Sequence, residues 1–290
     1  MKRPISIALA LSLTASLGVL APATAEEPEG SATSAILLIG DGMSLAQIYS
    51  AEIFAEEVLG SSLAMPGIVD NAVTRTHSAD SMVTDSAAAG TAIHSGYKTD
   101  NGAINVLPDG AWTYTLGQAA QAAGKSVGVL STARMTHATP ASVYGHDADR
   151  DAENLFAEQM AEFMPEVALG GGARHFLPDG KRDDGRDIIA EMVDAGYTNV
   201  TDAAELAAVD TENTDHLLGL FTSSHMSYEI DRVNEAKSEP SLAEMTAAAL
   251  AVLDNDPDGF FVSIESGRIC LLYTSPSPRD LNPNLVCRLE

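Results

Sequence analysis

The chain has 290 residues, 45% of them hydrophobic, and its 41 acidic and 16 basic side chains give a formal charge of −25. This apolar content excludes a disordered chain, and the composition is too polar for a bundle of membrane helices. The acid excess excludes nucleic acid as the main partner, because binding to a phosphate backbone depends on lysine and arginine, and it opposes stable docking on anionic membranes.

The first 25 residues have the pattern of a secretory signal peptide. Lys2 and Arg3 precede an apolar run that ends in small residues around Ala25. The pattern predicts cleavage after Ala25 and a periplasmic or secreted protein, with an N-terminal membrane anchor as the alternative. Residues 26–33, which are rich in Glu, Pro, Gly and Ser, are predicted to be a linker.

Short apolar runs alternate with helical patterns in the domain that we predict over residues 34–269. Strands are expected at 35–39, 126–130, 167–169 and 259–264. Helices are expected at 44–59, from Ser86 onward, and at 115–123, 188–195 and 242–253. This alternation predicts an α/β fold with a central, mostly parallel sheet flanked by helices. In such sheets ligands bind at the carboxyl ends of the strands.

Two short motifs place polar groups at such positions. Asp41 follows the first strand between Gly40 and Gly42, where its carboxylate suits a hard cation; an ordinary Asp-Gly turn is the alternative. Ser86 follows Asp85 and opens an alanine-rich helix, so that free backbone N–H groups and the helix dipole favour an anion such as phosphate. A serine that merely caps the helix is the alternative.

Together with several further segments, these motifs resemble the alkaline phosphatase family. The resemblance covers residues 34–269, and the order and spacing of its segments make it specific. The segments are 37–43, 83–92, 96–102, 131–141, 169–172, 241–245 and 258–269. The resemblance implies hydrolysis of small phosphate monoesters, Mg²⁺ and Zn²⁺ as cofactors, and a homodimer in the intact parent.

Two residues match the catalytic groups of the family. Ser86 matches the nucleophile that becomes phosphoserine. Arg150 matches the guanidinium that clamps two phosphate oxygens, a task that suits a planar fork of donors.

Metal ligands are implied in the same way. Asp41 matches the carboxylate that bridges a zinc and the magnesium, and Thr139 and Glu265 match magnesium ligands. His137 and Asp85 are expected beside these ligands rather than on the metal.

The resemblance fails after residue 269. The family pattern requires an Asp and a His where this chain has Cys270 and Thr274, and its later zinc ligands have no counterpart before Glu290. Residues 270–290 contain clustered Pro and Arg, resemble translated sequencing-adapter sequence, and are predicted to be a non-native tail. We therefore expect a truncated domain whose sheet is incomplete at the C-terminus. It would keep a partial magnesium site, build neither zinc site, and be inactive and poorly soluble.

Two other functions remain as alternatives. The chain could belong to a phosphodiesterase or sulfatase of the same superfamily, although Ser86 and Arg150 favour monoesters. Alternatively it is a noncatalytic acidic calcium-binding protein, because residues 147–158 imitate an EF-hand loop, with Asp147 first and Glu158 twelfth. Ala152 stands where that loop requires glycine, and Arg150 adds a positive charge.

Overall fold

The computed structural model describes residues 32–65, 72–269 and 271. Residues 1–32 form one unit and residues 33–290 a second, which holds all of the described helices and strands. The predicted signal peptide, the predicted linker up to residue 31, and the predicted tail apart from Leu271 lie outside the described residues and stay predictions. None of the described helices is both long enough and apolar enough to cross a membrane.

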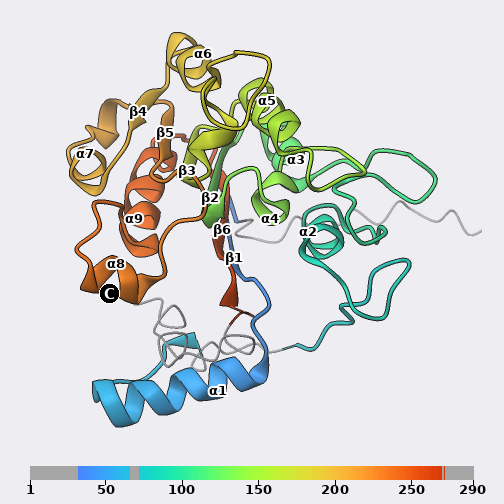
Figure 1. Cartoon of the computed structure of the whole chain (residues 1–290), viewed down its shortest axis with the longest axis vertical. Coiled ribbons are helices and arrows are strands. Elements are labelled where there is room, and N and C mark those ends of the chain that lie inside the picture. The colour runs from blue at the N-terminus through green and yellow to red at the C-terminus, as the bar shows by residue number, and fades with distance from the viewer. Residues whose placement is uncertain (1–31, 66–71, 270, 272–290) are drawn as a thin grey trace, which may run out of the picture. The chain divides into compact units, whose positions relative to one another are not determined.

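The second unit is built on a six-stranded sheet in which neighbouring strands run parallel (Figure 1). The order is β1-β6-β2-β3-β5-β4, with β1 (Ala35–Gly40), β2 (Ser126–Arg134), β3 (Val167–Gly171), β4 (Thr198–Val200), β5 (Leu217–Leu220) and β6 (Phe260–Ser266). Because β6 lies between β1 and β2, Ile39 and Ser131 flank Glu265 in register. Residues that follow these three strands therefore lie close together at the carboxyl ends of the strands.

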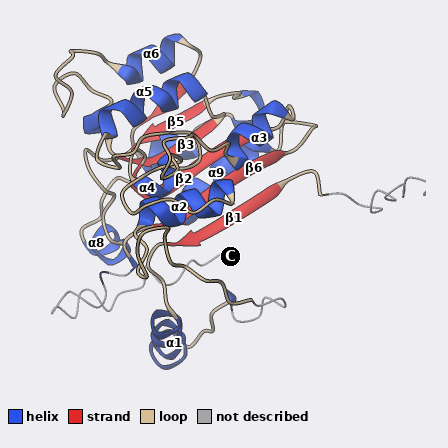
Figure 2. Cartoon of the chain, turned by 90° about the vertical axis from the view of Figure 1, so that its right-hand side faces the viewer, coloured by secondary structure: helices blue, strands red, loops and turns tan. Residues whose placement is uncertain are grey.

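Helices cover both faces of this sheet (Figure 2). One face carries α2 (Ser86–Ser95), α3 (Leu116–Ala122), α4 (Ala138–Ala141), α5 (Glu153–Phe163) and α6 (Ile188–Asp194). The opposite face carries α7 (Ala203–Ala207) and α9 (Leu242–Leu253).

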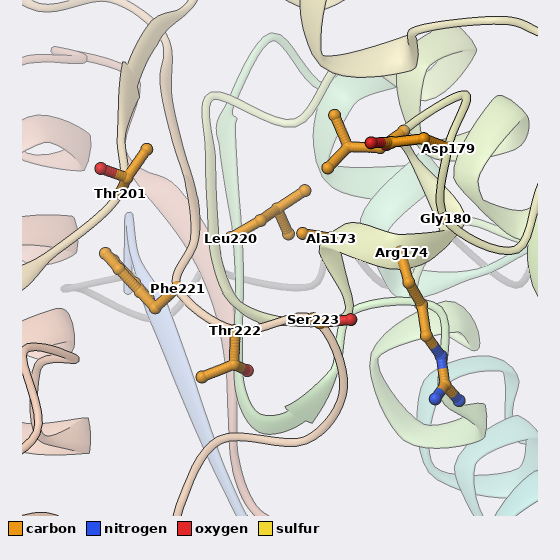
Figure 3. A pocket seen from close by; sticks show the side chains of 10 residues that line it. Ala173, Arg174, Asp179, Gly180, Thr201, Leu220, Phe221, Thr222 and Ser223 are labelled. Atoms are coloured by element: carbon orange, nitrogen blue, oxygen red, sulfur yellow. The ribbon is translucent and has the colours of Figure 1, made fainter.

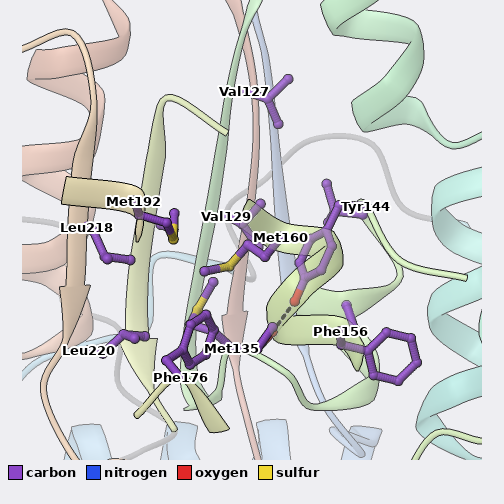
Figure 4. Close-up of a cluster of buried hydrophobic side chains, with 14 of the residues drawn as sticks. Val127, Val129, Met135, Tyr144, Phe156, Met160, Phe176, Met192, Leu218 and Leu220 are labelled. Atoms are coloured by element: carbon purple, nitrogen blue, oxygen red, sulfur yellow. Dashed lines mark hydrogen bonds between the residues drawn. The ribbon is translucent and has the colours of Figure 1, made fainter. Parts of the chain in front are cut away.

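Alternate residues of β2, β3, β5 and β6 supply the two hydrophobic cores, as the period of a strand requires. Val127 and Val129 of β2 join the cluster with Phe156 of α5, whereas Leu130 joins the cluster with Met245 of α9. Figure 4 shows the first cluster, where the Tyr144 hydroxyl donates to the Met135 carbonyl at 2.8 Å.

The helical segment after β1 matches the predicted 44–59, but only its first part is α-helical. Ser44 begins α1 (Leu45–Phe54) with a capping box that it forms with Gln47, and a π-helical turn, η1 (Ala55–Leu59), continues it to a left-handed Gly60. The remaining elements are the 3₁₀ turns η3 (Ala173–His175) and η4 (Thr211–Asn213) and the helix α8 (Glu229–Asn234).

The predicted fold class is confirmed, and the described sheet is wholly parallel rather than mostly so. All four predicted strands are present, but β2 and β6 extend to Arg134 and Ser266, beyond their predicted ends. The sequence interpretation missed β4 and β5, which form the far edge of the sheet. The prediction that the sheet is incomplete at the C-terminus stays a prediction.

Candidate active site

Asp41 lies directly after β1 and is held there by the end of β6. Its backbone N–H donates to the Ser266 carbonyl at 3.1 Å, and its own carbonyl accepts from the Ile269 N–H at 3.1 Å. The carboxylate is thereby fixed beside α2, where its Oδ1 accepts the Ser86 hydroxyl at 2.8 Å. This contact joins residues that are 45 positions apart in the chain.

Ser86 is the first residue of α2, and Asp85, not Ser86, is the residue that caps this helix. Asp85 Oδ1 accepts from the Ala88 N–H at 2.9 Å, and its Oδ2 accepts from the Gly102 N–H at 3.0 Å. The alternative that Ser86 is merely a helix cap is therefore wrong. Because Asp85 performs the capping, the Ser86 hydroxyl is left to face Asp41 at the positive end of the helix dipole.

Asp85 also holds the side chain of Arg150 beside the start of α2. Its Nη1 donates to Asp85 Oδ2 at 2.8 Å, and its Nη2 lies 3.3 Å from Nε2 of His137. The backbone N–H of Arg150 also donates to the Gly102 carbonyl at 2.7 Å. The side chain of Arg150 remains 24% exposed, so the guanidinium is anchored on one side and open on the other.

Glu265 is the most perturbed acid of the site. It is 1% exposed, and burial together with the neighbouring Asp41 raises its pKa to about 7, against the opposing effect of the Ser131 and Thr139 hydroxyls. Ser131 donates a short hydrogen bond to Glu265 Oε2, whereas the buried Oε1 has no hydrogen-bond partner among the described residues. A buried carboxylate oxygen without a partner is costly unless a cation or water meets it.

Asp41, Thr139 and Glu265 fit a magnesium ion, because they offer only oxygen ligands and include the unpartnered Oε1 of Glu265. They include none of the nitrogen or sulfur ligands that zinc sites usually contain. Among the described residues, no group of three or more His, Cys, Asp or Glu side chains is placed to hold a metal ion. The donor set thus suits the magnesium ligands that the resemblance implies, which stay a prediction.

His137 lies just before α4, beside Arg150 rather than on a carboxylate. Burial, and then the charges of Arg150 and Arg134, lower its pKa to about 4, so the ring is neutral. Its Nδ1 is buried without a partner in the described structure, and its ring meets that of His225 edge-on at 5.3 Å. The neutral imidazole can therefore accept from Arg150 and help to hold its guanidinium in place.

Sequence reasoning missed a buried polar cluster next to His137. Arg134 holds Glu153 through Nε at 2.6 Å and Nη2 at 2.7 Å, and its Nη1 lies 2.6 Å from Nε2 of His225. Burial and two arginines, Arg134 and Arg268, lower the pKa of His225 to about 3. Neither Glu153 nor His225 belongs to a motif with recognisable spacing, so no sequence signal could have found them.

The EF-hand interpretation of residues 147–158 is wrong. Helix α5 begins at Glu153, the seventh position of the loop, which has to stay irregular to wrap a calcium ion. Glu158, the predicted bidentate ligand, instead pairs with Arg182 at 2.7 Å and with Arg186 at 3.1 Å.

A cavity of about 390 Å³ opens at the carboxyl ends of β3 and β5, and Arg174, Leu220, Phe221 and Ser223 are among the residues that line it (Figure 3). It contains none of the predicted site residues. The arrangement around Ser86 is therefore a separate site.

Comparison with known proteins bears on the whole described domain. The family model described as alkaline phosphatase matches residues 32–271. The tissue-nonspecific alkaline phosphatase of Gallus gallus is 33% identical over 288 residues, covering 82% of this chain and 55% of that protein. Alkaline phosphatase 3 of Bacillus subtilis is 37% identical over 246 residues, covering 81% of this chain and 50% of that protein.

Solved structures of alkaline phosphatases also match the chain. The Thermus thermophilus alkaline phosphatase matches with a TM-score of 0.77 and 40% identity, over 81% of this chain and 49% of that one. A mutant alkaline phosphatase from the Antarctic bacterium TAB5, whose structure contains bound Mg, matches with a TM-score of 0.69 and 28% identity, over 82% of this chain and 65% of that one. The chain thus spans about half the length of the curated relatives that it matches.

Proposed function

The chain belongs to the alkaline phosphatase family, and on this premise we propose that it carries the nucleophile and the magnesium half of a site that hydrolyses phosphate monoesters. The observation that carries the proposal is the 2.8 Å hydrogen bond from the Ser86 hydroxyl to Asp41 at the N-terminus of α2. It places a nucleophile, a proton acceptor and a helix dipole at one point.

Ser86 attacks the phosphorus atom of the ester. The hydroxyl gives its proton to Asp41, a bond forms between Ser86 Oγ and phosphorus, and the bond from phosphorus to the alcohol oxygen breaks as that proton passes through water to the leaving alcohol. Water then attacks the phosphoserine, releasing inorganic phosphate and restoring the hydroxyl. Both transition states are loose and rich in negative charge, so positioning and charge stabilisation do most of the work.

Arg150 binds the nonbridging oxygens of the phosphoryl group. Its Nη1 already holds Asp85 at 2.8 Å, so that the open side of the fork faces the substrate in a fixed orientation. The first N–H groups of α2 add further donors for an anion. A phosphate monoester offers one more free oxygen to this fork than a diester does, which is why we propose monoesters.

Magnesium would be held by Asp41, Thr139 and Glu265, and when bound it supplies positive charge that offsets the two carboxylates and the developing charge on the phosphoryl group. The described residues do not assemble a zinc site. We therefore propose that the present chain binds phosphate but turns over esters far more slowly than a complete site does.

The experiment is an assay of the purified chain with p-nitrophenyl phosphate in the presence of Mg²⁺ and Zn²⁺, alongside its Ser86→Ala variant. We expect wild-type turnover close to that of the variant. Robust turnover by the wild type that is lost in Ser86→Ala would show that Ser86 is the nucleophile. It would contradict the proposal that the chain carries only the magnesium half of the site. Calorimetric titration with inorganic phosphate, sulfate and dimethyl phosphate separates the alternatives, because a sulfatase or phosphodiesterase site would prefer the second or third ligand.

We further propose that the chain is exported and that the intact parent forms a homodimer. Export follows from the signal-peptide pattern and is tested by N-terminal sequencing of the mature protein, which should begin at Glu26. Sedimentation of the intact parent tests the dimer.

A further inference from the structure

His94 is a buried histidine on the same helix as Ser86, at the other end of α2. It is 0% exposed, and the Phe261 ring packs against it edge-on at 6.4 Å. Burial lowers its pKa to about 4, so the imidazole is neutral. The proposed reaction gives this residue no role, and its place in the sequence indicates none.

Both ring nitrogens of His94 are hydrogen-bonded. Nδ1 lies 3.0 Å from the Gly90 carbonyl and 2.9 Å from Oγ of Ser142. Because a carbonyl only accepts, and because the Ser142 hydroxyl gives its proton to the Thr139 carbonyl at 2.7 Å, Nδ1 carries the imidazole proton. Nε2 then accepts the proton of the Ser263 hydroxyl at 3.0 Å.

These partners lie on the segments that carry the predicted magnesium ligands. Ser142 follows α4, and its hydroxyl binds the backbone of Thr139 itself. Ser263 lies two positions before Glu265 on β6, so the two side chains point to the same face of the sheet. A single side chain therefore connects the helix of the nucleophile to two segments that are 48 and 169 positions away from it.

The close packing of α2 on α4 also supports a structural link through His94. A Cβ added at Gly90 would lie 2.5 Å from Oγ of Ser142, so the absence of a side chain at Gly90 lets Ser142 reach His94. Ser142 is fully buried and cannot swing into solvent.

We propose that His94 is a positioning residue that fixes Ser86, Thr139 and Glu265 relative to one another by joining α2, α4 and β6. The proposal rests on the magnesium site of the proposed function. It assigns the buried network a purpose beyond packing, because loss of the imidazole would free the ligand segments from the helix of the nucleophile without removing any ligand.

The test compares His94→Ala with Met192→Ala in the full chain. Met192 is buried in α6, which packs on β4 at the far edge of the sheet, so its truncation costs stability without touching the site. In calorimetric titrations with Mg²⁺, we expect His94→Ala to weaken binding about 10-fold or more, as is typical when a group that orients a ligand is lost. Met192→Ala should leave the affinity unchanged, and His94→Asn, which keeps a donor toward Ser142, should restore part of it.

Amide hydrogen exchange gives a readout that does not depend on metal. His94→Ala should accelerate exchange at Ala141 and Ser142, whose N–H groups donate to the His137 and Ala138 carbonyls, and at Glu265. Met192→Ala should not. If wild type fails to bind Mg²⁺, the magnesium assignment fails, and the exchange pattern alone decides on His94. Equal effects of the two alanine variants, or none in His94→Ala, overturn the positioning role.

Discussion

Gly90 lies in the middle of α2, where alanine would ordinarily stabilise a helix by about 1 kcal/mol relative to glycine. The structure predicts the opposite result for Gly90→Ala. The new Cβ would meet Oγ of Ser142 at 2.5 Å and its Cβ at 3.2 Å. Ser142 is held in place by the Thr139 carbonyl and by His94, so it can yield only by breaking those hydrogen bonds.

The magnitude follows from three contributions. Overpacking in a well-filled core costs about 1–3 kcal/mol. Rotation of the Ser142 hydroxyl away from Thr139 and His94 loses hydrogen bonds worth about 1 kcal/mol each. The gain in helix propensity offsets about 1 kcal/mol of this. We expect Gly90→Ala to lower the free energy of unfolding by about 2–4 kcal/mol.

Urea unfolding of wild type, Gly90→Ala, Ser142→Ala and the double variant measures this directly. Removal of the Ser142 hydroxyl removes the closest contact, so Gly90→Ala should cost at least about 1 kcal/mol less in the Ser142→Ala background. Ala89→Gly, one position earlier in the same helix, calibrates the propensity contribution. If Gly90→Ala is more stable than wild type, or costs the same in both backgrounds, Ser142 does not oppose a side chain at position 90.

Three further predictions concern the buried acids and the sheet edge. Glu265→Gln should raise the free energy of unfolding in EDTA at pH 8 by about 1–3 kcal/mol while abolishing Mg²⁺ binding. Burial raises the pKa of Glu265 from 4.5 to about 7, so the wild type loses stability as the pH rises through this range and carries the full cost at pH 8; lower stability of the variant would contradict this. Arg134→Ala should cost about 3–5 kcal/mol at pH 7 by removing the guanidinium that pairs with the buried Glu153. Because the pKa of Glu153 is lowered from 4.5 to about 2, that cost should shrink as the pH falls through this range, and a cost independent of pH would exclude the pairing. Lysines at Ile36 and Leu38, which are 53% and 57% exposed on the edge strand β1, should reduce self-association in sedimentation experiments, and unchanged association would mean that copies do not meet at this edge.

The central strands could be predicted because each is a continuous apolar run that a glycine or polar residue ends. The strands at the far edge of the sheet, β5 and β4, could not be predicted. β4 is a three-residue strand of Thr198, Asn199 and Val200, which has no apolar run, and β5 contains Gly219. Both gain their strand conformation from pairing with their neighbours rather than from their own composition.

The site residues likewise divide into those with a local sequence signal and those without one. Asp41 and Ser86 were recognisable because each stands where a strand or helix boundary exposes backbone groups. His94 was not, because its partners lie 48 and 169 positions away and a buried histidine has no spacing that marks it. Only the folded chain shows that the cap of α2 is Asp85, which converts Ser86 from an ordinary helix-start serine into the partner of Asp41.

Binding of inorganic phosphate to the full chain, followed by calorimetry with and without Mg²⁺, tests the central claim most directly. We expect wild type to bind phosphate, Mg²⁺ to tighten this binding, and Arg150→Ala and Asp41→Asn each to weaken it. The site is contradicted if the affinity is the same in wild type and Arg150→Ala, or if Mg²⁺ leaves it unchanged.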